Sequence, residues 1–148
     1  MRFSVSPPMR ERLAEYGGFH RSSGNEWCHF FGIPSIVAGA GTLLSLVTLT
    51  HVAGFRLTLA ELVAGGVIAF YVVSARWLGV VTGVLMALLV ALGRAVPALV
   101  GLGLFVGGWI VQFVGHAAFE KRSPAFLKNL LHLLVGPAWL VERAFDRH

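Results

Sequence analysis

The chain has 148 residues, of which 56% are hydrophobic and only 13% are charged, and its mean hydropathy is +0.75. A soluble domain carries about 25% charged residues, so this composition excludes an ordinary soluble globular protein. The net charge is +5, and the single cysteine, Cys28, excludes an intramolecular disulfide and suits a reducing compartment.

Charged residues almost disappear from the middle of the chain. Between residues 33 and 114 they number four, namely Arg56, Glu61, Arg76 and Arg94. Because a bilayer core of ~30 Å needs ~20 helical residues, this stretch can cross a membrane several times. We therefore expect an all-α polytopic membrane protein that forms one membrane-embedded domain over residues 1–148. Its parts are a cytoplasmic or interfacial N-terminal segment (about 1–32), four transmembrane helices (33–115) and short interfacial helices (116–148).

The first span is expected to begin at Pro34, because proline suits the first turn of a helix. It should run to about 49–52, where Gly54-Phe55-Arg56 interrupts the apolar sequence. Thr58-x-x-Glu61 then predicts a capping box at the start of the second span. Glu61 is accordingly interpreted as a helix cap and not as a catalytic acid.

Further interruptions define the remaining spans. Arg76-Trp77 is typical of the membrane–water interface, where a charged head and an amphipathic ring sit at headgroup level. Arg94 and Pro97 indicate the next turn. We expect the second span to end near Ser74, the third to cover about 78–92, and the fourth to reach about Val114.

The basic residues predict the orientation. Nine of the twelve Lys and Arg residues lie in the two terminal segments, and Arg76 shares their side, whereas only Arg56 and Arg94 fall in the two opposite loops. This bias predicts that both termini are cytoplasmic, as in an integral protein of a bacterial inner membrane. Topology and anionic lipid headgroups account for the positive charge, so no nucleic-acid partner is required.

Histidines occur at positions 20, 29, 51, 116, 132 and 148. With four spans, the residues before the first and after the fourth lie on one face of the membrane. His20, His29, His116 and His132 can therefore meet there, whereas His51 belongs to the opposite end of the first span. His148 is the last residue and is not expected to take part.

The N-terminal pair requires a break in the helix. On one continuous helix, His20 and His29 would point in opposite directions. We expect Ser22-Ser23-Gly24 to provide the break and Asn25 to cap the following helix, so that both imidazoles converge. Asn25 also lies one turn before His29, and its role as a cap or as a ligand stays open.

The C-terminal pair is His116 and Glu120, one helical turn apart. Glu120 would accept the spare N–H of a metal-bound imidazole or would itself be a ligand. Ser123-Pro124 predicts the start of a further helix that carries His132 and ends at Gly136-Pro137. The cluster suits a metal site, and imidazole serves Zn, Cu, Fe and Ni alike.

The pattern His20-x4-Asn25-x3-His29-x2-Gly-Ile-Pro34, coupled to Gln112-Phe-x-Gly-His116-x3-Glu120-x3-Pro124-Ala125, resembles a known family. This is the membrane 2-hydroxy fatty acid dioxygenase family, whose yeast-type enzyme acts in phytosphingosine breakdown. The similarity covers nearly the whole chain. His20, His29 and His116 match the motif directly, and His132 matches it less closely.

The resemblance implies an Fe(II) enzyme that converts a long-chain 2-hydroxy fatty acid and O2 into CO2 and the acid one carbon shorter. His20, His29, His116 and His132 would be the metal ligands, and Glu120 and Asn25 the catalytic candidates. Arg21, Lys121 and Arg122 are candidates for holding the substrate carboxylate, and membrane lipid is the expected surrounding. Two alternatives stay open: a haem-binding electron-transfer bundle, and a non-catalytic lipid-binding or scaffold protein.

Overall fold

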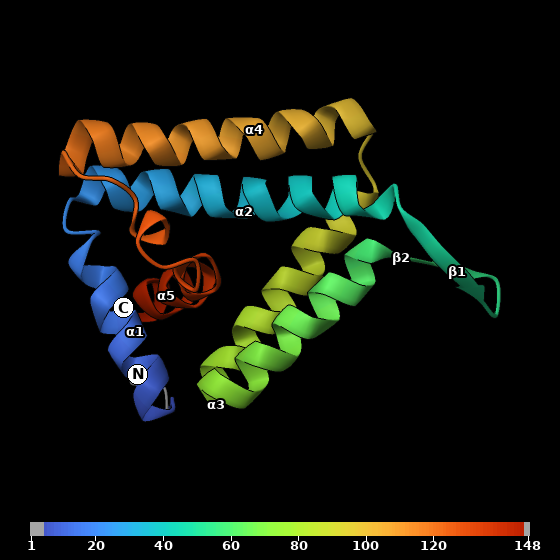
Figure 1. The fold of residues 1–148 in the computed structure, drawn as a ribbon, viewed down its shortest axis with the longest axis horizontal. Helices are drawn as coiled ribbons and strands as arrows, with labels where there is room; N and C mark the ends of the chain where they lie inside the picture. The colour runs from blue at the N-terminus through green and yellow to red at the C-terminus, as the bar shows by residue number, and fades with distance from the viewer. Residues whose placement is uncertain (1–4, 147–148) are drawn as a thin grey trace.

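The computed structural model describes residues 5–146 and is almost entirely helical (Figure 1). Arg2, Arg147 and His148, which entered the sequence predictions, lie outside these residues. In chain order the elements are α1 (Pro7–Gly18), α2 (Ser23–Ser45), β1 (Thr48–Val52), β2 (Phe55–Thr58), α3 (Leu59–Arg94), α4 (Ala98–Gly115), the π-helix η1 (His116–Glu120), the 3₁₀ turn η2 (Ala125–Leu127) and α5 (His132–Asp146).

Helix α3 is two helices in one. At Arg76 the backbone leaves the helical region (φ 49°, ψ −122°), and the chain turns back on itself (Figure 1). The two arms, 59–75 and 77–94, pack so closely that a Cβ on Gly79 would lie 1.9 Å from the Tyr71 carbonyl oxygen. The described chain has three helical segments long and apolar enough to span a membrane, namely α2, α3 and 98–120. Because α3 contains two arms, the four predicted spans agree with this architecture.

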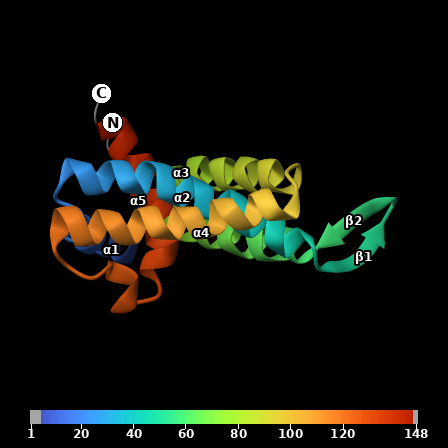
Figure 2. The same ribbon diagram turned by 90° about the horizontal axis from the view of Figure 1, so that it is seen from above.

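Helices α2 and α4 lie side by side and antiparallel (Figures 1 and 2). Small residues at seven-residue spacing make this close approach possible: a Cβ on Gly101 would meet Thr42 at 2.3 Å, and a Cβ on Gly108 would meet the Gly32 carbonyl at 2.8 Å. Small residues at such contacts are the usual way in which helices associate in membranes. Because the helices are antiparallel, this packing places the beginning of α2 next to the end of α4.

The α2–α4 pair and the α3 hairpin meet at one end and diverge at the other, and α1 and α5 fill the space between them (Figure 1). The buried core lies at this wide end and joins Leu13 of α1 to Tyr71 of α3 and Val135 of α5. Tyr71 donates a hydrogen bond to the Leu134 carbonyl at 2.6 Å, and Arg143 of α5 pairs with the buried Glu26 of α2 at 2.8 Å. The terminal helices are therefore part of the packed core.

The narrow end carries the β1–β2 hairpin, which projects away from the helices (Figure 2). Its turn places both Ala53 (φ 48°) and Gly54 (φ 80°) in the left-handed region, as a tight two-residue hairpin requires. Thr58 and Glu61 form the predicted capping box, in which Glu61 Oε2 accepts the Thr58 N–H at 2.7 Å. Glu61 also pairs with Arg94, so its predicted structural role is confirmed.

Three predicted helix boundaries were wrong. The first span begins at Ser23, and Pro34 lies inside α2. The helix continues through Pro34 because the neighbouring Gly32 packs closely against α4. The span ends at Ser45, since residues 48–58 form the hairpin. Gly136-Pro137 lies within α5 and does not end it; Gly136 instead provides room for the Tyr16 hydroxyl, 2.8 Å from where a Cβ would stand.

The cap of α2 was also placed wrongly. Ser22 is the N-cap and Asn25 lies in the first turn, so the break between the two histidines comes at 19–22. Ser123-Pro124 leads only into the single 3₁₀ turn η2, and α5 begins later, at His132. His116 and Glu120 belong to a π-helix, a rare widened turn that is frequent at functional sites.

Candidate metal centre

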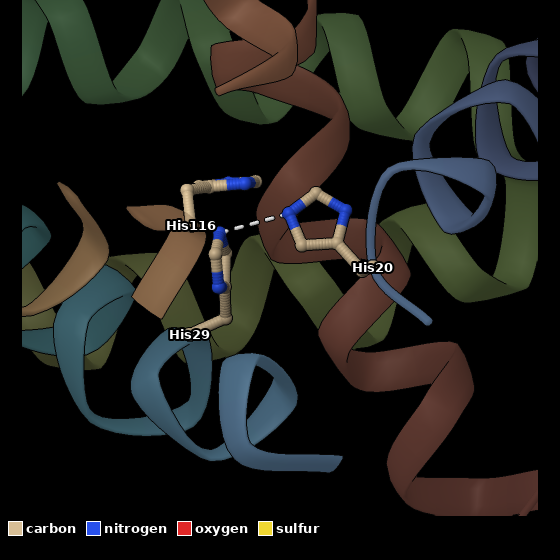
Figure 3. A group of neighbouring side chains, drawn as sticks. All are labelled: His20, His29 and His116. Atoms are coloured by element: carbon tan, nitrogen blue, oxygen red, sulfur yellow. Dashed lines mark hydrogen bonds between the residues drawn. The ribbon is translucent and has the colours of Figure 1, made fainter. Parts of the chain in front are cut away.

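Three histidines from separate segments converge at the wide end of the molecule (Figure 3). His20 comes from the loop between α1 and α2, His29 from α2 and His116 from η1. All three are buried, with exposed fractions of 3% or less, and one ring nitrogen of each lies within 4.8 Å of the others. We call these residues the histidine triad.

The backbone fixes the tautomers of two of the rings. His20 Nδ1 lies 2.7 Å from the Tyr16 carbonyl oxygen, and His29 Nδ1 lies 2.9 Å from the Asn25 carbonyl oxygen. A carbonyl only accepts, so each Nδ1 carries the proton and donates it. Each Nε2 is left with a lone pair, and the two Nε2 atoms face one another at 2.9 Å (Figure 3).

Two facing lone pairs repel unless a proton or a cation lies between or beside them. Burial, with a smaller contribution from the neighbouring His29 ring, lowers the pKa of His20 to about 3, so His20 is neutral at neutral pH. Neutral imidazole with an anchored Nδ1–H is the form that binds metals. The third ring is not anchored in this way: His116 Nδ1 is buried and has no hydrogen-bond partner in the described part of the chain, so a bound cation could satisfy a buried ring nitrogen there. The residues of the triad therefore fit a metal ion.

His132 is buried nearby but does not join the triad. Its ring packs against Tyr16 with centroids 5.9 Å apart, and its Nε2 lies 3.4 Å from Glu15 Oε2. The group of ring nitrogens that lie within 4.8 Å of one another does not include His132. Its role as a fourth ligand stays a prediction.

Glu120 holds the loop that carries His20. Its Oε1 accepts the backbone N–H groups of Arg21 and Ser22, each at 2.8 Å, and the Asn25 amide at 3.4 Å. Asn25 is completely buried, and its Oδ1 has no hydrogen-bond partner within residues 5–146. No hydrogen bond joins Glu120 to a histidine among the described residues, so its position favours anchoring of the loop.

The predicted carboxylate-binding residues lie outside the site. Arg21, Lys121 and Arg122 are all exposed, and none of them lines the cavity described next. Lys121 ends η1 in the left-handed conformation (φ 53°). Their contact with a substrate carboxylate stays a prediction.

A cavity of about 200 Å³ adjoins the triad and extends between α2, α3, α4 and α5. His29, His116 and His132 stand in its wall, together with three further polar side chains, namely Tyr16, Tyr71 and Gln112. The rest of the wall is largely apolar. The site therefore joins a group of imidazoles that could hold a metal ion to a compartment suited to a hydrocarbon chain.

Sequence reasoning missed the functional position of Tyr16 and Gln112. The Tyr16 ring stacks on His20 with centroids 4.1 Å apart, and Gln112 is 7% exposed. Both lie four residues before a triad histidine, and that spacing was the available signal. Trp139, which packs on both Tyr16 and His20, left no such signal, because it comes from α5.

A family model described as 2-hydroxy-palmitic acid dioxygenase Mpo1-like matches residues 7–147. The chain belongs to the Mpo1-like family. A similar protein, the 2-hydroxy-palmitic acid dioxygenase MPO1 of Saccharomyces cerevisiae (strain ATCC 204508 / S288c), is 33% identical over 131 residues, which are 86% of this chain and 73% of the yeast protein. No solved structure matches. The family resemblance predicted from the paired histidine motifs is thereby confirmed, and the Mpo1-like match spans the whole triad.

Proposed function

We propose that this chain is an Fe(II)-dependent dioxygenase of long-chain 2-hydroxy fatty acids. In the proposed reaction, R–CH(OH)–COOH and O2 give R–COOH, CO2 and H2O. The carbon–carbon bond to the carboxyl group breaks, the α carbon is oxidised to the new carboxyl group, and O2 is reduced. The observation that carries the proposal is the triad of buried imidazoles beside a largely apolar cavity.

His20, His29 and His116 would hold the iron, which supplies the redox chemistry that lets O2 react with the acid. The yeast relative is named as a 2-hydroxy-palmitic acid dioxygenase, which supports the proposed substrate class and the use of O2. With only these three side chains holding it, the iron would stay accessible to the 2-hydroxy carboxylate of the acid. Iron also belongs to the metals that imidazole suits.

The chain's own residues position the acid. The Tyr16 hydroxyl and the Gln112 amide stand in the cavity wall beside the triad and are suited to hydrogen-bond the substrate head. Burial raises the pKa of Tyr16 well above its ordinary value, so the hydroxyl remains a donor. Arg21, Lys121 and Arg122 would attract the carboxylate at the surface, and Trp139 and Tyr16 shield the triad from water.

The geometry disfavours the haem alternative. A haem iron with two histidines needs its imidazoles on opposite faces of a macrocycle. Here three rings converge on one point, with two Nε2 atoms 2.9 Å apart. A purified protein without a Soret absorption band would agree with the triad as a mononuclear site.

The test uses purified protein loaded anaerobically with Fe(II), then supplied with a long-chain 2-hydroxy fatty acid and air. The expected products are CO2 and the acid one carbon shorter, with one O2 consumed per acid. The non-hydroxylated acid and the 3-hydroxy isomer should be inert, because neither carries a hydroxyl oxygen on the α carbon, which is the carbon to be oxidised, next to the carboxylate. Turnover with zinc alone, which has no redox chemistry, or ester hydrolysis without O2 uptake, would overturn the proposal.

A further inference from the structure

The cavity beside the triad is continued by a second one. A cavity of about 130 Å³ lies deeper between α2 and α3, and it shares four wall residues with the first, namely Ile36, Val37, Val67 and Met86. Methionine is unbranched and flexible, and a small movement of Met86 would join the two spaces. We call them the near chamber and the far chamber.

The two chambers follow one face of each helix that encloses them. On α2 the wall runs from His29 and Ile33 through the shared pair to Ala40, Gly41 and Leu44, at spacings of three or four residues. On the first arm of α3 it runs in the same way from Tyr71 through Val67 to Ala60. The walls are therefore continuous from the triad to the level of Leu44, near the opposite end of α2.

The length of this path matches a long acyl chain. Leu44 stands fifteen residues after His29, which at ~1.5 Å per residue is a distance of about 22 Å. An extended hydrocarbon advances ~1.3 Å per carbon–carbon bond of ~1.5 Å, so the path accommodates about 17 bonds. The far chamber has no charged residue in its wall.

We propose that the near and far chambers form one acyl channel, whose far end at Leu44 and Ala60 sets the longest acid that the site accepts; Ala64 lines the channel one helical turn before that end. This inference rests on the proposed function, because it takes the substrate head to be at the triad. The hydrocarbon chain of the longest acid that fits occupies the channel past Ala64, and its methyl end meets Leu44 and Ala60. A chain longer than the channel withdraws its head from the triad.

A third cavity of about 200 Å³ offers the matched control. It lies between α2, the second arm of α3 and α5, and Ala144 is in its wall but in neither chamber. It shares Ile33, Met86 and Pro137 with the near chamber, so it is the other direction that a chain might take. It does not follow the face of α2 that leads to Leu44.

The experiment compares Ala64→Phe with Ala144→Phe, which make the same change in volume in the two directions. Iron-loaded enzyme is given a series of 2-hydroxy acids from octanoic to icosanoic. With Ala64→Phe, kcat/KM for the longest acids should fall by about tenfold for each two methylenes displaced from the channel, while the octanoic derivative and the iron content are unchanged. Ala144→Phe should keep the profile of the unaltered protein. Leu44→Ala should move the preference toward longer acids.

The outcomes separate the two proposals. If the unaltered protein consumes no acid of any length, the proposed function fails, and the channel is then tested by equilibrium binding of the same acids. Loss of long-chain binding or turnover in Ala144→Phe and not in Ala64→Phe would overturn the channel. So would a chain-length profile that neither Ala64→Phe nor Leu44→Ala changes.

Discussion

The histidine triad depends on small, local contacts that fix each ring. His20 and His29 donate through Nδ1 to carbonyl oxygens four residues earlier, and their Nε2 atoms are therefore presented to the same point. A metal site with three such ligands cannot readily lose one. The residue scale is thus where iron binding should be tested first.

Replacing His20, His29 or His116 singly with Ala should lower the affinity for Fe(II) by more than about 100-fold. Loss of a residue that only hydrogen-bonds to a metal ligand typically costs ~10–100-fold, and loss of a ligand itself should cost more. Bound iron is measured by mass spectrometry after gel filtration. His51→Ala is the control, because His51 is exposed on β1 at the far end. If His51→Ala loses iron while His20→Ala retains it, the triad is not the site.

Glu120 should act through the loop that it anchors. In Glu120→Gln one acceptor oxygen remains for the Arg21 and Ser22 N–H groups, so we expect about a 10-fold loss of iron affinity; Glu120→Ala removes the acceptor and should cost more. Hydrogen exchange at these two amides should accelerate in the same order. The exposed Glu11 provides the control, since Glu11→Gln should change neither measurement. Faster iron loss without faster exchange would point to direct ligation.

The convergence of the triad could be predicted at the residue scale because it follows from spacing. The break between His20 and His29 was required by geometry, and it is present at 19–22. How the free backbone N–H groups of this break are satisfied could not be predicted. The N–H groups of Arg21 and Ser22 donate to Glu120, which lies 99 and 98 residues further along the chain. The contacts of Tyr16 with Trp139 depend in the same way on a distant segment.

At the scale of elements, the contact between α2 and α4 sets the depth of His29 relative to His116. Gly108 lies at its centre, and a Cβ there would stand 2.7 Å from the Ile36 side chain. The neighbouring Gly107 faces open space, with no heavy atom within 4 Å of its Cβ position. The two adjacent glycines therefore allow a matched comparison.

Gly108→Leu should force the helices apart, lower the free energy of unfolding by about 1–3 kcal/mol and reduce iron affinity. Gly107→Leu should leave iron affinity unchanged and stabilise slightly, by up to ~1 kcal/mol, since glycine is a poor helix former. Thermal unfolding in detergent and iron retention measure both effects. Equal behaviour of the two variants would show that the close contact does not control the triad.

Helix boundaries were predictable where the signal is local and not where packing overrides it. The capping box at Thr58 and the break at Arg76 both stand where the sequence places them. Pro34 and Gly136-Pro137 predicted helix ends that do not exist. Around these residues, contacts with α4 and with Tyr16 keep the chain helical.

At the scale of the whole molecule, the wide end carries both described termini and the narrow end carries the β hairpin (Figure 1). Four apolar segments were predictable from the long apolar sequence and its interruptions. The placement of α1 and α5 between the two hairpins was not, because it depends on pairs such as Glu26 with Arg143 that are 117 residues apart. The orientation in the membrane stays a prediction from charge.

Arg56 and Arg94 are the basic residues at the narrow end, and Arg94 is paired there with Glu61. Because most Lys and Arg residues lie at the other end, the narrow end should face away from the cytoplasm. In a Cys28→Ser background, His51→Cys should react with a membrane-impermeant maleimide in intact cells, whereas Glu11→Cys should react only after permeabilisation. The reverse pattern would contradict the predicted orientation.

The three ligands of the triad are spread along the chain in a way that bears on biosynthesis. His20 and His29 leave the ribosome early, and His116 follows only after nearly ninety further residues, by which point the last apolar helix has been made. Because a site formed by folding binds its metal only once all the ligands are assembled, the nascent protein has no complete centre while its helices are entering the bilayer. The proposed iron would therefore be captured only after His116 has been made and α2 and α4 lie together.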